Sequence, residues 1–314
     1  MNIAIDMMGG DYAPEEAIKG ISLYLKNNNN PSSLTLIGDE QKIKDLLAVA
    51  QINSLNISIV HASQTIEIHE HPTKALKEKP HSSISIGFHL LSKDKIQAFI
   101  SAGNTGAMMV GSLYSIKAIA GVQRPTIGAY LPREDGSLGL LVDVGLNSDC
   151  KPENLLQFAL LGSLYAEHIL NIDRPRVALV NLGEEEGKGN LLTQAAYPLL
   201  KNNNKINFIG NIEGRDLLLN KADVMVCDGY TGNILLKFAE SIYDLIKQRN
   251  IQDEYFDRFN FEIYGGVPVL GVNKPVIIGH GISHANAFKS MINIAEKMLK
   301  ENMTGLIASS FKGN

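Results

Sequence analysis

The 314-residue sequence has only two cysteines, Cys150 and Cys227, and no tryptophan. Two cysteines cannot build a disulfide framework, and their spacing matches no metal-binding motif. We therefore expect both thiols to be reduced, as is usual in the cytoplasm. The N-terminal stretch carries Asp6 and no basic segment ahead of it, which argues against a secretory signal. Since no apolar run reaches the ~18 residues needed to span a bilayer, the sequence predicts a cytoplasmic protein, at most peripheral at the inner membrane face.

The charge balance and the absence of nucleotide-binding motifs narrow the function further. A formal net charge of -4 argues against a nucleic-acid binder, which usually carries a basic face. No G-x-G-x-x-G follows an expected strand and no G-x-x-x-x-G-K-[ST] is present, which disfavours a dinucleotide or P-loop enzyme. The histidines of HEHP (69–72) lie two residues apart in an expected loop, which favours a solvated turn over a metal site. The sequence thus predicts no metal and no other cofactor.

Short β-like runs alternate with helical patterns over almost the whole chain. Several runs are continuously apolar, which is typical of strands covered on both faces, and helical periodicity is found at 155–169, 231–249 and 284–299. This alternation predicts an α/β/α sandwich around a mostly parallel sheet. No long linker divides the chain, so we expect a single domain over 1–314. Strands are expected at 3–6, 34–37, 57–60, 96–101, 126–131, 138–144, 177–181, 206–209, 224–227 and 276–278.

Five of the expected strand-to-helix turns are rich in glycine. In parallel α/β sheets, ligands bind beyond the carboxyl ends of the strands, where such turns lie. Glycine allows close backbone approach, and Asn or Thr caps the next helix, which leaves free N–H groups at a positive helix end. Any single βα turn needs such residues for structure alone, but five in one chain favour a shared seat for phosphate. The turns are MMGGDYAPEEA (7–17), SAGNTGAMM (101–109), VDVGLNSDC (142–150), NLGEEEGKGN (181–190) and CDGYTGNIL (227–235).

Three features lie outside this glycine pattern. His280 follows an expected strand and precedes a helix, a position that suits a proton donor, a ligand contact or a structural cap. TKALKEKPHSS (73–83) is a basic patch, for which a solvated helix face is the alternative to a docking surface. Cys227 has the reactive atom of a nucleophile, but its strand indicates a buried residue, and Asp228 would raise its pKa rather than activate it.

Motifs along nearly the whole chain resemble one known family, the acyl-ACP:phosphate acyltransferases of bacterial phospholipid synthesis. The resemblance implies a fold similar to phosphate acetyltransferases and isocitrate-dehydrogenase-like proteins, and a homodimer. It also implies a reaction that moves a long-chain acyl group from acyl carrier protein (ACP) to inorganic phosphate. A membrane glycerol-3-phosphate acyltransferase then uses the acyl phosphate. The matching segments are IAIDMMGGDYAPE, SAGNTGA, GVQRPTIGAYLP, DVGLNSDCKPENLLQFA, NLGEEEGKGN, FIGNIEGRD, ADVMVCDGYTGN, GGVPVLGVN and VIIGHGIS.

The sequence departs from this family pattern in three places. The segment near 247–264, where members carry a longer pair of amphipathic helices, is shortened here, so we expect a smaller protrusion. Leu146 replaces a smaller alanine beside the expected site, which suggests an altered acyl pocket. Lys77 stands where the family commonly has arginine, which keeps the charge but loses the bidentate fork.

Within this resemblance, each candidate residue has an expected role. Main-chain amides of the two G-x-T-G turns are expected to bind phosphate or the oxyanion, while strand-end acids orient these donors. The expected catalytic residues are His280, which would protonate the leaving sulfur, Lys188 and Asn233. The expected substrate-binding residues are Gly10, Asp11, Gly103, Asn104, Thr105, Gly106, Asn147, Arg215, Asp228, Gly229, Thr231 and Gly232. Lys74, Lys77 and Lys79 are expected to dock the acidic ACP.

Other functions remain open at this point. A short-chain acyl-CoA phosphate acyltransferase is the nearest alternative, and it should prefer acetyl-CoA to palmitoyl-ACP. A nicotinamide dehydrogenase of similar fold would bind NAD. A non-catalytic scaffold for lipid-synthesis enzymes would show no turnover.

Overall fold

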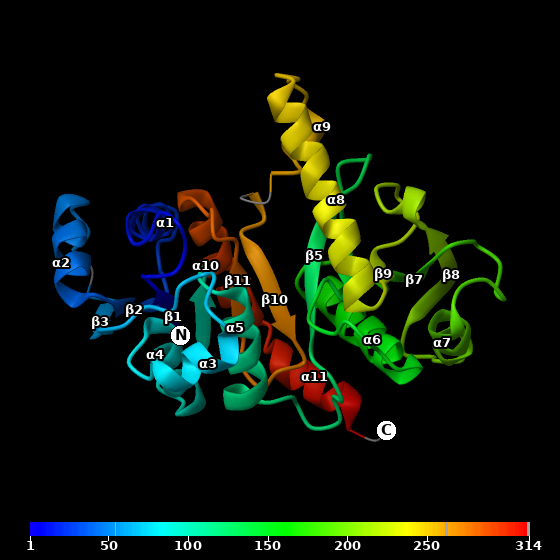
Figure 1. Ribbon diagram of the computed structural model, residues 1–314, viewed down its shortest axis with the longest axis horizontal. Coiled ribbons are helices and arrows are strands. Elements are labelled where there is room, and N and C mark those ends of the chain that lie inside the picture. Colours follow the sequence, from blue (N-terminus) through cyan, green and yellow to red (C-terminus); the bar gives the residue numbers. More distant parts are fainter. Residues whose placement is uncertain (54, 261–262, 313–314) are drawn as a thin grey trace. The chain divides into compact units, whose positions relative to one another are not determined.

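The computed structural model describes residues 1–53, 55–260 and 263–312, and the chain divides into two compact units. Unit 1 is formed by Met1–Lys117 with Phe261–Thr304, and unit 2 by Ala118–Asn260 with Gly305–Asn314. Each unit has its own run of strands flanked by helices, labelled in Figure 1. The single domain expected over 1–314 stays a prediction.

The described residues of unit 1 form six strands in the order β3-β2-β1-β4-β11-β10. Five of them run parallel, and β10 pairs antiparallel with β11. Strands β1, β2, β4 and β11 are nearly continuous apolar runs with buried residues, as sequences covered on both faces predict, whereas the edge strand β3 has no buried residue. They are β1 (Asn2–Asp6), β2 (Ser33–Gly38), β3 (Ile57–His61), β4 (Ala98–Ser101), β10 (Gly266–Leu270) and β11 (Val276–Gly279).

Helices cover the unit 1 sheet. Helices α1 and α10 pack against each other, while α4 packs on β1, β2 and β4; Figure 1 shows α3, α4 and α5 on the side opposite α1 and α10. The helices are α1 (Glu15–Lys26), α2 (Glu40–Val49), α3 (Pro72–Glu78), α4 (Ser83–Ser92), α5 (Thr105–Gly111) with the π-helical turn η1 (Ser112–Ile116), and α10 (Ala285–Lys300). Helix α11 (Met303–Phe311) follows α10 and continues into unit 2.

In unit 2, the residues that the structure describes form five strands in the order β5-β6-β9-β7-β8. Strands β6, β9, β7 and β8 are parallel, and β5 forms an antiparallel hairpin with β6. The strands are β5 (Thr126–Pro132), β6 (Leu138–Val142), β7 (Arg176–Asn181), β8 (Asn207–Glu213) and β9 (Val224–Val226). The helices are α6 (Pro152–His168), α7 (Leu191–Lys201), η2 (Gly214–Asp216), α8 (Gly229–Gln248) and α9 (Glu254–Asp257).

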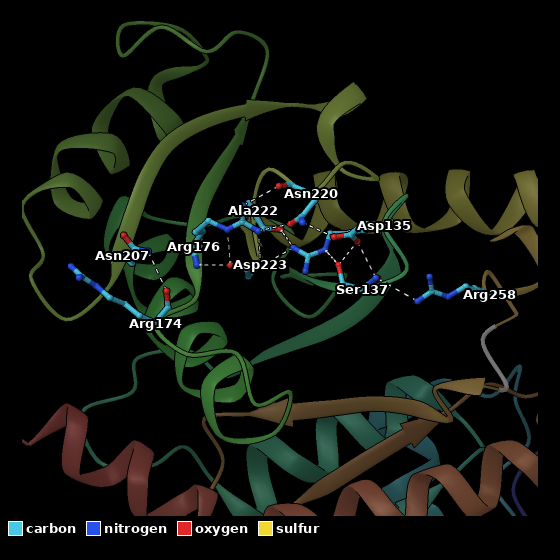
Figure 2. Close-up of polar contacts among 10 residues, drawn as sticks. Asp135, Ser137, Arg174, Arg176, Asn207, Asn220, Ala222, Asp223 and Arg258 are labelled. Carbon is cyan, nitrogen blue, oxygen red and sulfur yellow. Dashed lines mark hydrogen bonds and ion pairs between the residues drawn. The ribbon is translucent and has the colours of Figure 1, made fainter.

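A buried ion-pair network lies at the amino ends of the parallel strands of unit 2 (Figure 2). The Arg133 guanidinium, 4% exposed, donates to Asp223 over 2.7 Å and to the Ala222 carbonyl over 2.8 Å. Arg176 donates to the other Asp223 oxygen over 2.9 Å, and Arg258 of the α9 segment donates to the Gly136 carbonyl. The hairpin, two strand starts and the α9 segment are therefore tied together by charge-assisted bonds.

The shortened segment near 247–264 contacts the β5–β6 hairpin where the structure describes it: Tyr255 donates to the Pro132 carbonyl over 3.5 Å and Arg258 to the Gly136 carbonyl. Tyr255, Phe256 and Phe259 form an aromatic cluster, and Lys247 pairs with Asp257 over 2.6 Å. Across the described residues, no helix is both long and apolar enough to cross a membrane.

Candidate anion-binding site

Two of the five sequence-predicted turns, 7–17 and 101–109, meet the turn after β11 at the carboxyl edge of the unit 1 sheet. The other three turns belong to unit 2. The Asp11 amide donates to the Gly281 carbonyl over 2.7 Å, which joins the turn after β1 to the turn after β11. A Cβ on Gly9 would lie 2.6 Å from the Gly103 nitrogen, so the turn after β4 also lies against the turn after β1. Because β1, β4 and β11 are parallel neighbours, their carboxyl ends must meet in this way.

The turn 103–106 offers main-chain donors. Asn104, 2% exposed, caps α5 by accepting from the Ala107 amide over 2.8 Å. Its own side-chain amide donates to the carbonyls of Glu67 and Glu70, each over 2.9 Å, which fixes the turn against that loop. The N–H groups of 104, 105 and 106 have no partner among the described residues. They are the free donors that the glycine pattern predicts.

Asp6 lies beneath this turn at the end of β1. Its carboxylate accepts from the Ser101 hydroxyl over 2.6 Å and from the Met8 amide over 3.0 Å. The Gly103 amide in turn donates to the Ser101 hydroxyl oxygen over 3.0 Å. Burial raises the pKa of Asp6, although hydrogen bonds from Ser101 and Ser83 oppose the shift.

The other predicted residues of unit 1 lie around these turns. His280 is half-buried directly after β11, and Gly10 has a φ of +103°, a conformation that favours glycine. The turn after His280 also places His284 in a stack on Tyr12, with ring centroids 4.5 Å apart. The first amide of α10 is already occupied, since Ala285 donates to Glu16 over 2.8 Å.

In unit 2, a buried carboxylate organises the turn 143–147. Asp143 is fully buried and accepts from the main-chain amides of Gly145, Leu146 and Asn147 over 3.2, 3.1 and 2.8 Å. The Asn147 side chain also donates to Asp143, over 2.7 Å, and to the Pro125 carbonyl, over 2.8 Å. Burial raises the pKa of Asp143, because the hydrogen bonds only partly compensate for desolvation.

The second G-x-T-G turn differs from the first in how its amides are used. The Gly229 amide donates to the Asn147 carbonyl over 2.8 Å, and the Thr231 amide donates to Asp228 over 2.9 Å. Gly232 donates to the Asp228 carbonyl over 3.0 Å. Of the first amides of α8, only that of Tyr230 has no partner within the described chain. Asp228 and Thr231 thus act here as a helix cap.

Lys188 and Arg215, the predicted cations of unit 2, differ in whether an acidic side chain neutralises them. The side chain of Lys188 is exposed, and its ammonium group forms no hydrogen bond or ion pair with any residue that the structure describes. Arg215 pairs with Glu213 over 2.6 Å, and its side chain is 77% exposed. The amide of Asn233 donates to the Val144 carbonyl over 3.1 Å, which leaves its oxygen as an acceptor. Lys188 is therefore the least compensated of the predicted cations.

The predicted docking lysines also fall into two groups. Lys74 and Lys77 are exposed on α3, and Lys74 lies 3.9 Å from Glu78. Lys79 instead binds Glu70 over 2.7 Å and the Thr65 carbonyl over 2.7 Å, which holds the loop that carries the partners of Asn104.

The cysteines are poor nucleophiles. Cys227 is 2% exposed, and burial together with Asp228 raises the pKa of its thiol well above the ordinary value. Burial likewise raises the pKa of Cys150 to about 11. Within the described ranges no group of three or more His, Cys, Asp or Glu side chains is arranged to hold a metal ion.

Sequence reasoning missed two hydroxyl groups at the unit 1 edge. Ser101 links Asp6 to Gly103, and Ser283 has a buried Oγ without a hydrogen-bond partner in the part of the chain described. Both serines lie inside motifs already singled out, SAGNTGA and VIIGHGIS. Ser101 is the last residue of β4, whereas Ser283 lies in the turn between β11 and α10.

Comparisons with known proteins find similarity to one protein family over nearly the whole chain. The family described as "Fatty acid synthesis protein" matches residues 1–305. A phosphate acyltransferase from Dictyoglomus turgidum is 44% identical, covering 96% of this chain and 94% of its own length. One from Chlorobaculum parvum is 41% identical, covering 98% of each.

Solved structures of similar fold include two phosphotransacetylases. That of Streptococcus pyogenes has a TM-score of 0.66 at 15% identity, covering 95% of this chain and 94% of its own. EutD phosphotransacetylase from Staphylococcus aureus has a TM-score of 0.62 at 15% identity, with coverage of 95% and 94%. The expected α/β fold, similar to phosphate acetyltransferases, is confirmed.

Proposed function

The chain belongs to the fatty acid synthesis protein family that includes the phosphate acyltransferases, and from this premise we propose its substrates and the use of its site. It is an acyltransferase with inorganic phosphate as acceptor. We propose that the donor is a long-chain acyl-ACP and that a membrane glycerol-3-phosphate acyltransferase consumes the acyl phosphate. The full-length similarity to phosphate acyltransferases, 44% identity over 96% of the chain, is the observation that carries this proposal.

The phosphate seat is the turn 103–106 in unit 1. The amides of Asn104, Thr105 and Gly106 have no partner among the described residues, and they begin the helical run of α5. Main-chain donors of this kind bind a dianion without a counter-ion and without reorganisation. The Asn104 side chain is fully engaged, so it supports the turn rather than touching phosphate.

The phosphate nucleophile needs no dedicated general base in the chemical step. A phosphate oxygen attacks the thioester carbonyl carbon, the C–O bond forms, and the C–S bond breaks with both electrons leaving on sulfur. His280, half-buried at the end of β11, is the proposed proton donor to that thiolate. Lys188 is the proposed unit 2 cation that attracts the anionic substrates, since no described residue neutralises it.

The deciding experiment compares donors. The purified protein is incubated with phosphate and either palmitoyl-ACP or acetyl-CoA, and acyl phosphate is trapped as the hydroxamate while free ACP is measured. Phosphate-dependent turnover of palmitoyl-ACP is expected, with acetyl-CoA far slower. Preference for acetyl-CoA would establish the short-chain alternative, and no turnover with either donor would favour the scaffold.

We also propose a homodimer that uses the exposed apolar face of α8. Tyr230, Ile234, Phe238 and Leu245 are 65%, 50%, 66% and 55% exposed, and their spacing places them along one face. Large apolar side chains gathered in this way are typical of an interface. Light scattering is expected to give twice the 34.2 kDa chain mass for the wild type and one chain mass for Phe238→Asp. A wild type of one chain mass at micromolar concentration contradicts the dimer.

A further inference from the structure

Two of the unit 1 turns share one buried acid. Asp6 is 1% exposed, and its two carboxylate oxygens accept from different turns. One oxygen accepts from the Met8 amide over 3.0 Å, in the turn after β1. The other accepts from Ser101 over 2.6 Å, and Ser101 holds the Gly103 amide over 3.0 Å in the turn after β4.

The packing around this acid leaves it no freedom. A Cβ on Gly9 would lie 2.5 Å from the Asp6 oxygen, and one on Gly103 would lie 3.3 Å from it. Both turns therefore approach the carboxylate as closely as main chain can. The next three residues after Gly103 are those whose amides are free.

We propose that Asp6 is the positioning residue of the phosphate seat: through Ser101 it fixes the direction of the free amides at 104–106 without touching phosphate. This inference rests on the proposed phosphate-dependent function. Asp6 forms no ion pair with any residue that the structure describes, and its partners are hydroxyls and main-chain amides. Because burial raises the pKa of Asp6, the folded protein holds this proton more tightly than the unfolded chain does. The unfolding free energy therefore falls as pH rises from the ordinary pKa of an aspartate through the raised pKa of Asp6. Stability alone therefore does not require an acid here.

The variant Asp6→Asn separates the two oxygens. If the amide oxygen faces Ser101, the NH2 group faces the Met8 N–H, donor against donor. If the amide is turned around, its NH2 group faces Ser101, and the Ser101 hydroxyl proton loses its acceptor because an NH2 group can only donate. Either orientation releases one turn while volume and burial are kept.

The test measures the KM for phosphate, the KM for acyl-ACP, and the phosphate dissociation constant by calorimetry. Asp6→Asn is expected to raise the phosphate KM and dissociation constant roughly fivefold to tenfold, the worth of about one hydrogen bond. The KM for acyl-ACP is expected to stay within about twofold of the wild type, because the acyl donor does not depend on these amides. Ser101→Ala, which removes the relay but leaves the Met8 bond, is expected to show the same split.

Glu296→Gln is the matched control. Glu296 is another acid of unit 1, 7% exposed, which accepts from Ser32 over 2.7 Å and Tyr24 over 3.1 Å near the start of β2. It is expected to leave both constants unchanged. Folded Asp6→Asn and Ser101→Ala proteins with wild-type phosphate constants overturn the inference. An inactive wild type that still binds phosphate overturns the proposed reaction alone, and the calorimetric comparison then decides the inference.

Discussion

At the residue scale, the two G-x-T-G turns look alike in sequence but use their glycines differently. In the turn after β4, the amides at 104–106 have no partner in the described part of the chain. In the turn after β9, Gly229 and Gly232 are engaged, and Gly232 lies against the main chain of Asp143. The motif predicts a capped helix start in both cases. It cannot predict which amides remain free, because the partner of the Gly229 amide, the Asn147 carbonyl, lies about 80 positions away in the sequence.

The close approach at Gly232 gives a residue-scale prediction. A Cβ there would lie 1.8 Å from the Asp143 carbonyl oxygen and 2.9 Å from the Cys227 sulfur. Both neighbours are buried, so α8 must shift, and Gly232→Ala is expected to lower the unfolding free energy by roughly 3 kcal/mol. Urea unfolding measures this change.

Gly214→Ala is the control for that substitution, because no atom lies within 4 Å of its Cβ position. Its unfolding free energy is expected to change by no more than about 0.5 kcal/mol. Equal effects of the two substitutions would show that the contact with Asp143 does not limit the packing of α8.

At the element scale, the continuously apolar runs in the sequence predict the positions of the strands well where a strand is covered on both faces. All ten expected strands are present, with β4, β6 and β9 shorter and β8 longer than the patterns indicate. Strand β10 was missed because GGVPVL contains two glycines and a proline, which argue against a strand. It forms nonetheless as the antiparallel partner of β11, a pairing that local sequence does not encode.

The network around Asp223 gives an element-scale prediction, since it joins β7, β9 and the β5–β6 hairpin (Figure 2). Burial alone would raise the pKa of Asp223, but bonds from Arg176 and Arg133 outweigh it and lower the pKa to about 2. A lowered pKa stabilises the fold above the unfolded value near 3.8 and loses this effect as pH falls toward 2.

Asp223→Asn is therefore expected to cost about 3 kcal/mol of unfolding free energy at pH 7, because Arg133 stays buried without its counter-charge. The difference from the wild type should shrink by about 2 kcal/mol between pH 4 and pH 2. Denaturant unfolding at several pH values measures both quantities. A difference that is independent of pH would mean that Asp223 titrates normally in the folded protein.

At the scale of the whole molecule, recognition of a carrier protein depends on where charged side chains without a neutralising partner lie on the surface, rather than on the net charge of the protein. The formal charge is -4, yet Lys74 and Lys77 are exposed on one short helix, α3. Sequence predicted Lys79 as a third member, but it binds Glu70 and the Thr65 carbonyl. Reversing Lys79 would disturb the loop that holds Asn104, so it would confuse docking with the phosphate seat.

The docking prediction therefore uses only Lys74 and Lys77. Replacing both by Glu is expected to raise the KM for acyl-ACP about fivefold to tenfold and to weaken its salt dependence, because ACP is acidic and exposed charges act mainly on encounter. The phosphate KM should not change.

Lys93→Glu with Lys95→Glu is the matched control: both lysines are exposed just before β4, at the opposite edge of the unit 1 sheet. Each double variant has a formal charge of -8, that is -4 with two further changes of -2. Because net charge is equal in the two variants, a rise in KM confined to the α3 variant assigns docking to α3, whereas an equal rise in both reduces the effect to general repulsion.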